Sequence, residues 1–168
     1  MSTTTLTVLE NGKPLLFSFD DLMSYHGFGF PGGVAHGFKV MQRALPLLAD
    51  GEVPERREIA IRTAFKGPGA RDAFEMVTRS LTEGRYKVDA DLAQPERGTT
   101  LQAYVFILSY RGTEIRLRIR DGIVRDEFIA LGRRPDRTPE EDERHEWLKL
   151  DMRDRLLALP ADQAYDLF

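Results

Sequence analysis

His26 begins the segment of the chain most able to do chemistry, His26-Gly-Phe-Gly-Phe-Pro-Gly-Gly33. An imidazole titrates near neutral pH, so His26 could act as a general acid or base, ligate a metal ion, or cap the end of a helix. A metal site needs several ligands close together, and no cluster of Asp, Glu or Cys surrounds His26 in the sequence. This setting favours a structural histidine, with the catalytic and metal-binding roles as alternatives.

Two further histidines extend these alternatives. His36 follows in the next expected helix, opposite in periodicity to Val34 and Phe38, and is the candidate for a second metal ligand. If a metal were present, His26 and His36 would hold it. One imidazole cannot retain zinc alone, so we expect no tightly bound metal and no cofactor. His145 falls in an acidic helix, for which we expect a surface position.

The glycine-rich stretch after His26 could bind a ligand. Glycines let a ligand approach the backbone, and the start of a helix presents unpaired N–H groups to anions. Gly32 would leave this space open, while Phe28 and Phe30 would cover the apolar part of the ligand. The alternative is that both phenylalanines are buried packing residues.

A second glycine-rich turn, Lys66-Gly-Pro-Gly-Ala-Arg-Asp72, also opens an expected helix. Its amides, together with Lys66 and Arg71, could hold a carboxylate or phosphate, and Gly69 would keep the backbone accessible. Asp72 could orient His26 in an acid–base pair, or stabilise the first turn of the helix through its dipole. A plain strand-to-helix turn with solvated charges is the alternative.

The composition excludes several classes of function. The chain has 168 residues, of which 42% are hydrophobic and 30% charged, as in an ordinary folded domain. It has no cysteine, which excludes a disulfide, a thiolate nucleophile, an iron–sulfur cluster and a Cys-type zinc site. A net charge of -3 argues against a dedicated nucleic-acid-binding protein. The start of the chain does not resemble a signal peptide and no apolar run is long enough for a membrane span, so we expect a cytoplasmic protein with no membrane partner.

The spacing of apolar residues predicts an α+β fold. Ser18 is the expected cap of a short first helix, and Asn11-Gly12 and Arg111-Gly112 are expected turns. Arg116, Arg118 and Arg120 alternate with apolar residues and form a basic stripe, for which a solvated sheet face is expected. The expected elements are a strand at 6–9, helices at 18–25 and 31–49, a strand at 58–65, a helix at 71–83, and three antiparallel strands at 85–92, 101–110 and 113–120.

Residues 133–168 are expected to form a charged linker and a helical tail attached to a domain of residues 1–132. Thr138-Pro-Glu-Glu141 is a capping box with proline at the first helical position. Leu148, Met152, Leu156 and Leu159 then give this helix one apolar face. That face must be covered by the domain or by a partner protein, because an exposed stripe of this length promotes aggregation.

These motifs resemble the FmdE-like family, whose members are components of formylmethanofuran dehydrogenases. His26-Gly-Phe-Gly-Phe-Pro-Gly32 is similar to that family's opening H-G-H-x-C-P-G, and Gly37-Phe38-Lys39 looks like its Gly-x-Arg. Asp72-Ala73, the hairpin at 110–116 and the tail at 156–168 also resemble segments of the family. The resemblance implies the family's helix–strand–helix–three-strand mixed sheet. It also places the protein near one-carbon or metal-cofactor metabolism.

The chain departs from the family at the metal ligands. Phe28 stands where the family has its second histidine, Phe30 where it has its first cysteine, and Gly69 near its second cysteine. Of the ligands that the resemblance implies, only His26 is present. The two phenylalanines would turn a metal-binding mouth into an aromatic one.

We therefore expect a small-molecule binding or accessory protein, a homodimer, that holds an anionic or aromatic molecule in one pocket between the two glycine-rich turns. The first alternative is an enzyme in which His26 is the general acid or base, Asp72 orients it, and Lys66 or Arg71 binds a substrate anion. The second alternative is a structural component of a larger complex, with a vestigial metal site.

Overall fold

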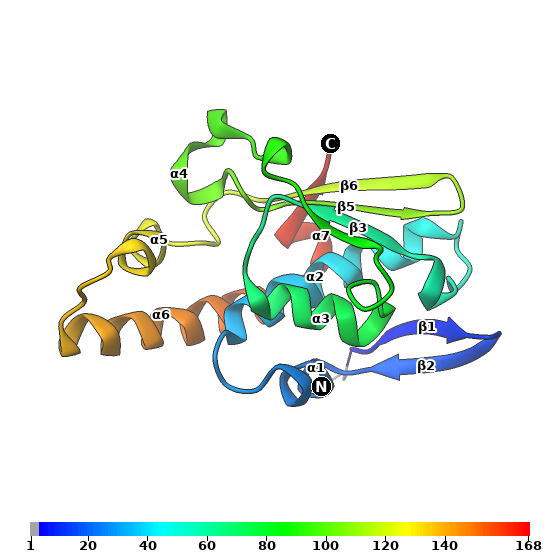
Figure 1. Ribbon diagram of the computed structural model, residues 1–168, viewed down its shortest axis with the longest axis horizontal. Coiled ribbons are helices and arrows are strands. Elements are labelled where there is room, and N and C mark those ends of the chain that lie inside the picture. The colour runs from blue at the N-terminus through cyan, green and yellow to red at the C-terminus, as the bar shows by residue number, and fades with distance from the viewer. Residues whose placement is uncertain (1–3) are drawn as a thin grey trace.

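A computed structural model describes residues 4–168 (Figure 1). Residues 1–3, which begin the expected domain and the segment compared with a signal peptide, lie outside the described residues. No described helix is long and apolar enough to cross a membrane. The helices and strands are β1 (Leu6–Glu10), β2 (Lys13–Phe17), α1 (Phe19–His26), α2 (Pro31–Leu48), β3 (Ala60–Thr63), α3 (Pro68–Thr78), β4 (Tyr86–Val88), α4 (Gly98–Leu101), β5 (Val105–Tyr110), β6 (Thr113–Ile119), α5 (Asp126–Arg133), α6 (Pro139–Ala158), α7 (Ala161–Ala164) and β7 (Tyr165–Leu167).

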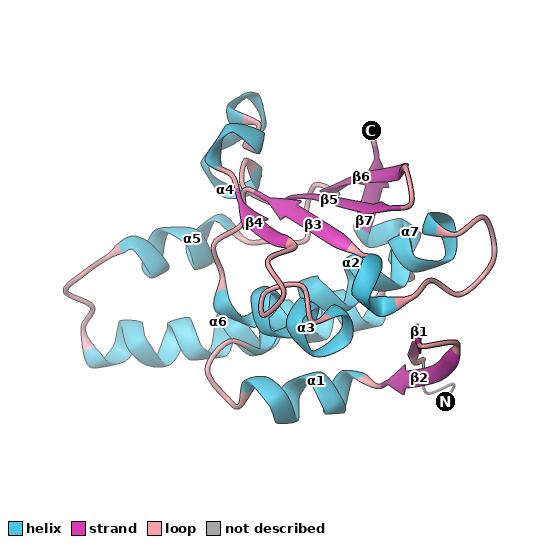
Figure 2. Cartoon of the chain, turned by 45° about the vertical axis from the view of Figure 1, so that its right-hand side comes forward, coloured by secondary structure: helices cyan, strands magenta, loops and turns pink. Residues whose placement is uncertain are grey.

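The main sheet has the strand order β4-β3-β5-β6-β7 and is mixed, with α2 and α3 lying along one side of it (Figure 2). The expected α+β class is confirmed. Most neighbouring strands are antiparallel, whereas β4 runs parallel to β3, unlike the antiparallel strand expected there. The cause is α3, because a helical crossover returns the chain to the end of the sheet at which β3 began.

The hairpin of β1 and β2 forms a separate two-stranded sheet. Asn11 and Gly12 adopt the left-handed φ values of 50° and 79° that its tight turn requires, so the expected turn is confirmed. The second strand was not expected. Pro14 is tolerated in it because it lies opposite Leu9, whose N–H points away from β2 to the carbonyl of Pro54 at 2.9 Å.

Side-chain caps fix the starts of α1 and α6. Ser18 and Asp21 form a reciprocal capping box at α1, and Thr138 and Glu141 form another at α6. Both helix starts are those expected from the sequence. By contrast, α3 begins at Pro68 rather than at residue 71 and ends at Thr78.

Helix α2 is the centre of the core. Every residue from Pro31 to Met41 is buried, because α3, α6 and the main sheet surround this half of the helix (Figure 2). Pro46 lies inside the last turn, where its side chain is exposed and the helix ends two residues later.

The tail completes the same core. Leu148, Met152 and Leu156 of α6 are buried, as expected, and α6 packs along α2. Beyond it, β7 joins the edge of the main sheet beside β6. The expected boundary between residues 132 and 133 falls inside α5, a helix that was not predicted, so the charged linker is only residues 134–137.

Candidate functional site

His26 and Asp72 lie together, as the acid–base hypothesis requires. Nδ1 of His26, in the last turn of α1, is 2.8 Å from Oδ2 of Asp72 in the first half of α3. Nε2 of His26 accepts a hydrogen bond of 3.0 Å from the backbone N–H of Phe30. An N–H donor requires an unprotonated nitrogen, so the ring is the neutral tautomer with its proton on Nδ1, donated to Asp72.

This arrangement leaves His26 without a free lone pair. Its two hydrogen bonds connect α1, the loop before α2, and α3. His26 therefore has a structural role, because it holds these three segments together. Arg71 does not reach a separate anion site, because its Nε lies 3.1 Å from Oδ1 of Asp72. To act as a base, His26 would first have to release the N–H of Phe30.

The structure contradicts the expected pocket between the two glycine-rich turns. A Cβ on Gly69 would lie 2.6 Å from the carbonyl oxygen of Phe30 and 2.7 Å from the nitrogen of Val34. The backbones of α2 and α3 are thus in direct contact, and no ligand fits between them at this point. A Cβ on Gly32 would likewise overlap Cε of Met152, so this glycine lets α2 lie close to α6. Both glycines allow helices to approach each other.

Phe28 and Phe30 do not form the expected aromatic cover of a shared pocket, nor are they buried. The side chain of Phe28 is 97% exposed and that of Phe30 is 40% exposed. The ammonium of Lys149 in α6 lies 4.5 Å from the centre of the Phe30 ring and donates to the carbonyl of Gly29 at 3.2 Å. This contact holds the loop against α6.

His36 is fully buried and has no free ligand position. Its Nδ1 lies 2.8 Å from the hydroxyl of Tyr165 and its Nε2 3.2 Å from the sulfur of Met152. Burial lowers the pKa of His36 to about 3, so the ring is neutral. The described residues contain no group of three or more His, Cys, Asp or Glu side chains placed to hold a metal. The described residues therefore offer no third ligand to a metal that His26 and His36 would hold.

Lys66 instead lines a different cavity, of about 580 Å³, between the main sheet and α5. The cavity opens where β3 ends and β5 begins, beside the first turn of α3. Its remaining wall comes from the segment between β4 and β5. The lining residues are Ala64, Phe65, Lys66, Gly67, Ala90, Ala93, Thr99, Thr100, Gln102, Ala103, Tyr104, Phe128, Ile129, Gly132 and Arg133.

Three aromatic residues contribute to the walls of this cavity, and its charges are positive. The rings of Phe65 and Tyr104 lie 4.8 Å apart, and Phe128 of α5 also contributes to the lining. Lys66 and Arg133 are its two charged residues, and in the described part of the chain neither has a carboxylate within 4 Å. Burial raises the pKa of Tyr104, so its hydroxyl stays protonated and can donate a hydrogen bond at neutral pH.

Buried histidines support two of these aromatic walls. The ring of His36 lies 4.7 Å from that of Tyr104. The ring of His145 stacks on Phe128 at 5.3 Å. The expected surface position of His145 is wrong: the residue is 6% exposed, and its Nε2 is buried without a hydrogen-bond partner. Desolvation, and then the charges of Lys149 and Arg137, lower the pKa of His145.

Sequence reasoning found Lys66 but missed Tyr104, Phe128 and Arg133. The last two lie on α5, which was not predicted. A signal for that helix was present, since Asp126 and Glu127 stand in its first turn and Arg133 in its last, as the helix dipole favours.

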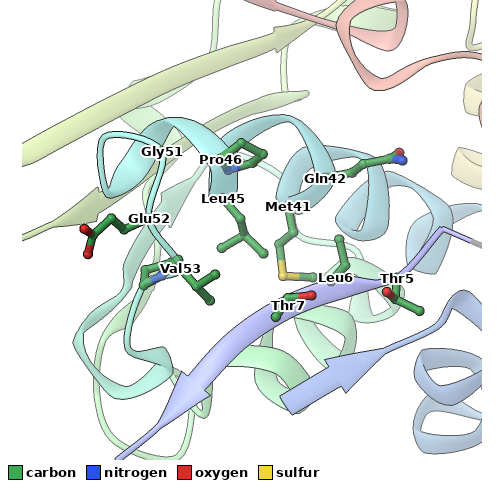
Figure 3. Close-up of a pocket in the computed structure, with 11 residues that line it drawn as sticks. Thr5, Leu6, Thr7, Met41, Gln42, Leu45, Pro46, Gly51, Glu52 and Val53 are labelled. Carbon is green, nitrogen blue, oxygen red and sulfur yellow. The ribbon is translucent and has the colours of Figure 1, made fainter. Parts of the chain in front are cut away.

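A second cavity, of about 310 Å³, lies between β1, the second half of α2 and the loop at residues 51–54 (Figure 3). Met41, Leu45 and Val53 point into it from these elements, while Glu52 points outward. No cation lines it. It is therefore less suited to an anion than the cavity beside Lys66.

Comparison of the chain with protein-family models and with curated proteins finds no match.

Proposed function

We propose that the protein is a binding module for a small aromatic anion, and that the ligand occupies the cavity beside Lys66. The observation that supports this proposal most strongly is the combination of aromatic walls with two unpaired cations and no lining carboxylate. Ligand sites in proteins are mainly apolar concavities with a few polar groups that fix orientation. The size of the cavity, about 580 Å³, is within the usual range of such sites.

Each part of the cavity has a role in this proposal. The ring of the ligand packs against Phe65 and Phe128, the partly exposed aromatic residues of the lining, where offset or edge contacts between aromatic rings are favourable. The carboxylate or phosphate binds Lys66 and Arg133, which repel each other less once an anion lies between them.

The proposal retains the expected ligand class and changes the site. A diverged member of the FmdE-like family that lost its metal ligands would bind an organic anion instead. The enzyme alternative is less well supported, because His26 is engaged on both nitrogens and does not line the cavity. The expected homodimer remains a prediction.

Binding of benzoate, followed by NMR chemical-shift changes and by calorimetry, tests the proposal. We expect a dissociation constant on the order of 1 mM or tighter, as for a small fragment. Benzyl alcohol, which has the ring but no charge, should bind at least about tenfold more weakly. Lys66→Ala with Arg133→Ala should abolish benzoate binding.

Two single variants serve as controls. Arg71→Ala removes the cation that was expected from the sequence to bind the anion together with Lys66. Arg71 lies outside the cavity, so this variant should leave the affinity for benzoate unchanged. His26→Ala should also leave it unchanged, apart from a loss of stability of about 1–2 kcal/mol. Loss of binding in Arg71→Ala and retention in Arg133→Ala would overturn the assignment of the site.

A further inference from the structure

The side of the main sheet opposite α2 and α3 carries a row of cations in cross-strand register. Arg62 of β3 pairs with Lys87 of β4 on one side and with Ile107 of β5 on the other. Ile107 in turn pairs with Arg116 of β6. Because paired residues point to the same side of a sheet, Lys87, Arg62, Ile107 and Arg116 form one row, hereafter the cationic row.

No described helix lies over the central part of β5 and β6 on this side (Figure 1). Ile107 is nevertheless only 1% exposed. Its cross-strand neighbours on the same side are Arg62 and Arg116, and long arginine stems can cover an apolar neighbour while their charged ends stay in water. The surface is therefore apolar beneath and positively charged above.

Two carboxylates share this side of the sheet, Asp166 of β7 in register with Arg118 and Glu114 of β6 two residues before Arg116, but few of the cations form ion pairs with them. Most arginines of the described chain form ion pairs with carboxylates, but Arg116, Arg118 and Lys87 have none within 4 Å. Arg62 has one contact, of 3.5 Å, with Glu114. Lys87 and Arg62 are neighbours of like charge in direct register, which destabilises a sheet unless an anion lies near them.

Phe168 orders the arginine side chains. Its backbone N–H donates to the carbonyl of Arg116 at 3.2 Å, next to the end of β7. The guanidinium groups of Arg116 and Arg118 lie 4.9 Å and 5.4 Å from the centre of its ring. Two arginines held by one aromatic ring lose less side-chain freedom when they bind an anion than two free ones.

We infer that the cationic row, together with Arg118, is a docking surface for an acidic protein segment in extended conformation. Arg116 and Arg118 are two residues apart on one strand, so their side chains are spaced by about 6.8 Å. Alternate residues of an extended peptide have the same spacing, so carboxylates at every second position of a peptide that runs along β6 meet Arg116 and Arg118. Arg62 and Lys87 lie on neighbouring strands and add positive charge beside that peptide. Charge complementarity with the row selects glutamate or aspartate.

A single-stranded nucleic acid fits the surface less well. Stacking of successive bases needs several free aromatic faces. Phe168 is the aromatic residue of the surface, and both arginines already contact it.

The test uses a fluorescent peptide of alternating glutamate and threonine, about 12 residues long, and measures anisotropy at about 20 mM salt. We expect saturable binding that weakens at about 500 mM salt. Arg116→Gln with Arg118→Gln should raise the dissociation constant about tenfold or more. Lys13→Gln with Arg153→Gln removes the same charge elsewhere on the surface and should change it less than twofold.

Three outcomes would overturn the inference. One is equal binding of the peptide in which glutamine replaces glutamate, and another is unchanged affinity in the Arg116→Gln, Arg118→Gln variant. The third is tighter binding of a twelve-nucleotide oligothymidylate, which would make the surface a nucleic-acid site. If the double variant does not fold, Lys87→Gln tests the same row from its other end, with an expected loss of about threefold.

Discussion

Acidification from pH 6.5 to about pH 4.5 should lower the free energy of unfolding by roughly 3 kcal/mol through His36 alone. Burial lowers the pKa of His36 from 6.5 to about 3 in the folded protein. Between these two values the unfolded chain binds a proton that the folded chain does not. Falling pH favours the state that binds more protons, so the contribution is complete above pH 6.5 and decreases by about 1.4 kcal/mol per pH unit below it.

Urea unfolding of the protein and of His36→Asn, at several pH values from 7.5 to 4.5, measures this contribution. The amide oxygen of asparagine can accept the hydrogen bond of Tyr165, but the smaller side chain loses the contact with Met152. The variant should therefore be less stable than the parent at neutral pH. The difference between them should shrink by roughly 3 kcal/mol at pH 4.5, because asparagine does not titrate.

His145→Asn is a second test, because burial also lowers the pKa of His145, and its stability difference from the parent should likewise shrink on acidification. If the difference between parent and His36→Asn stays constant from pH 7.5 to 4.5, the assignment of His36 as a neutral buried ring is refuted. An NMR titration of the His36 ring with a midpoint near 6.5 would refute it independently.

Two further outcomes follow from the contacts of α2. Gly69→Ala should lower the free energy of unfolding by about 3 kcal/mol in denaturant titrations, because its Cβ would lie 2.6 Å from the carbonyl of Phe30. Gly29→Ala, whose nearest neighbour would be 3.8 Å away, should change it far less, and equal effects would contradict the packing argument. Deletion from Thr138 onward removes α6 and β7 and should leave an insoluble core. A truncated protein with unchanged Tm would disprove that dependence.

Strong local signals in the sequence predicted the turns and helix starts that carry them. Ser18 and Thr138 identified two helix starts, because a capping box consists of two hydrogen bonds between residues only three positions apart. Arg111-Gly112 identified the hairpin of β5 and β6, where both residues have positive φ. The alternation of polar and apolar residues in β6 identified the dry and wet sides of the sheet.

The candidate site depended on contacts between distant segments. Gly32 and Gly69 stand in glycine-rich segments like those that bind ligands. Their small size is needed because another helix lies against each of them, and a short stretch of sequence does not reveal that neighbour. The cavity beside Lys66 combines residues from position 64 to position 133. His145 lies in a helix of strongly polar composition, and only the position of α5 shows that its ring is covered by Phe128.

The bond between His36 and Tyr165 joins residues that are 129 positions apart. During synthesis on the ribosome, α2 is therefore complete long before the side chain that satisfies its buried imidazole has been made. Until β7 emerges, that imidazole must remain hydrated or be protected by another protein. Such dependence on a distant segment delays final collapse and lengthens the exposure of apolar surface. The nascent chain should accordingly need chaperone assistance more than its modest size suggests.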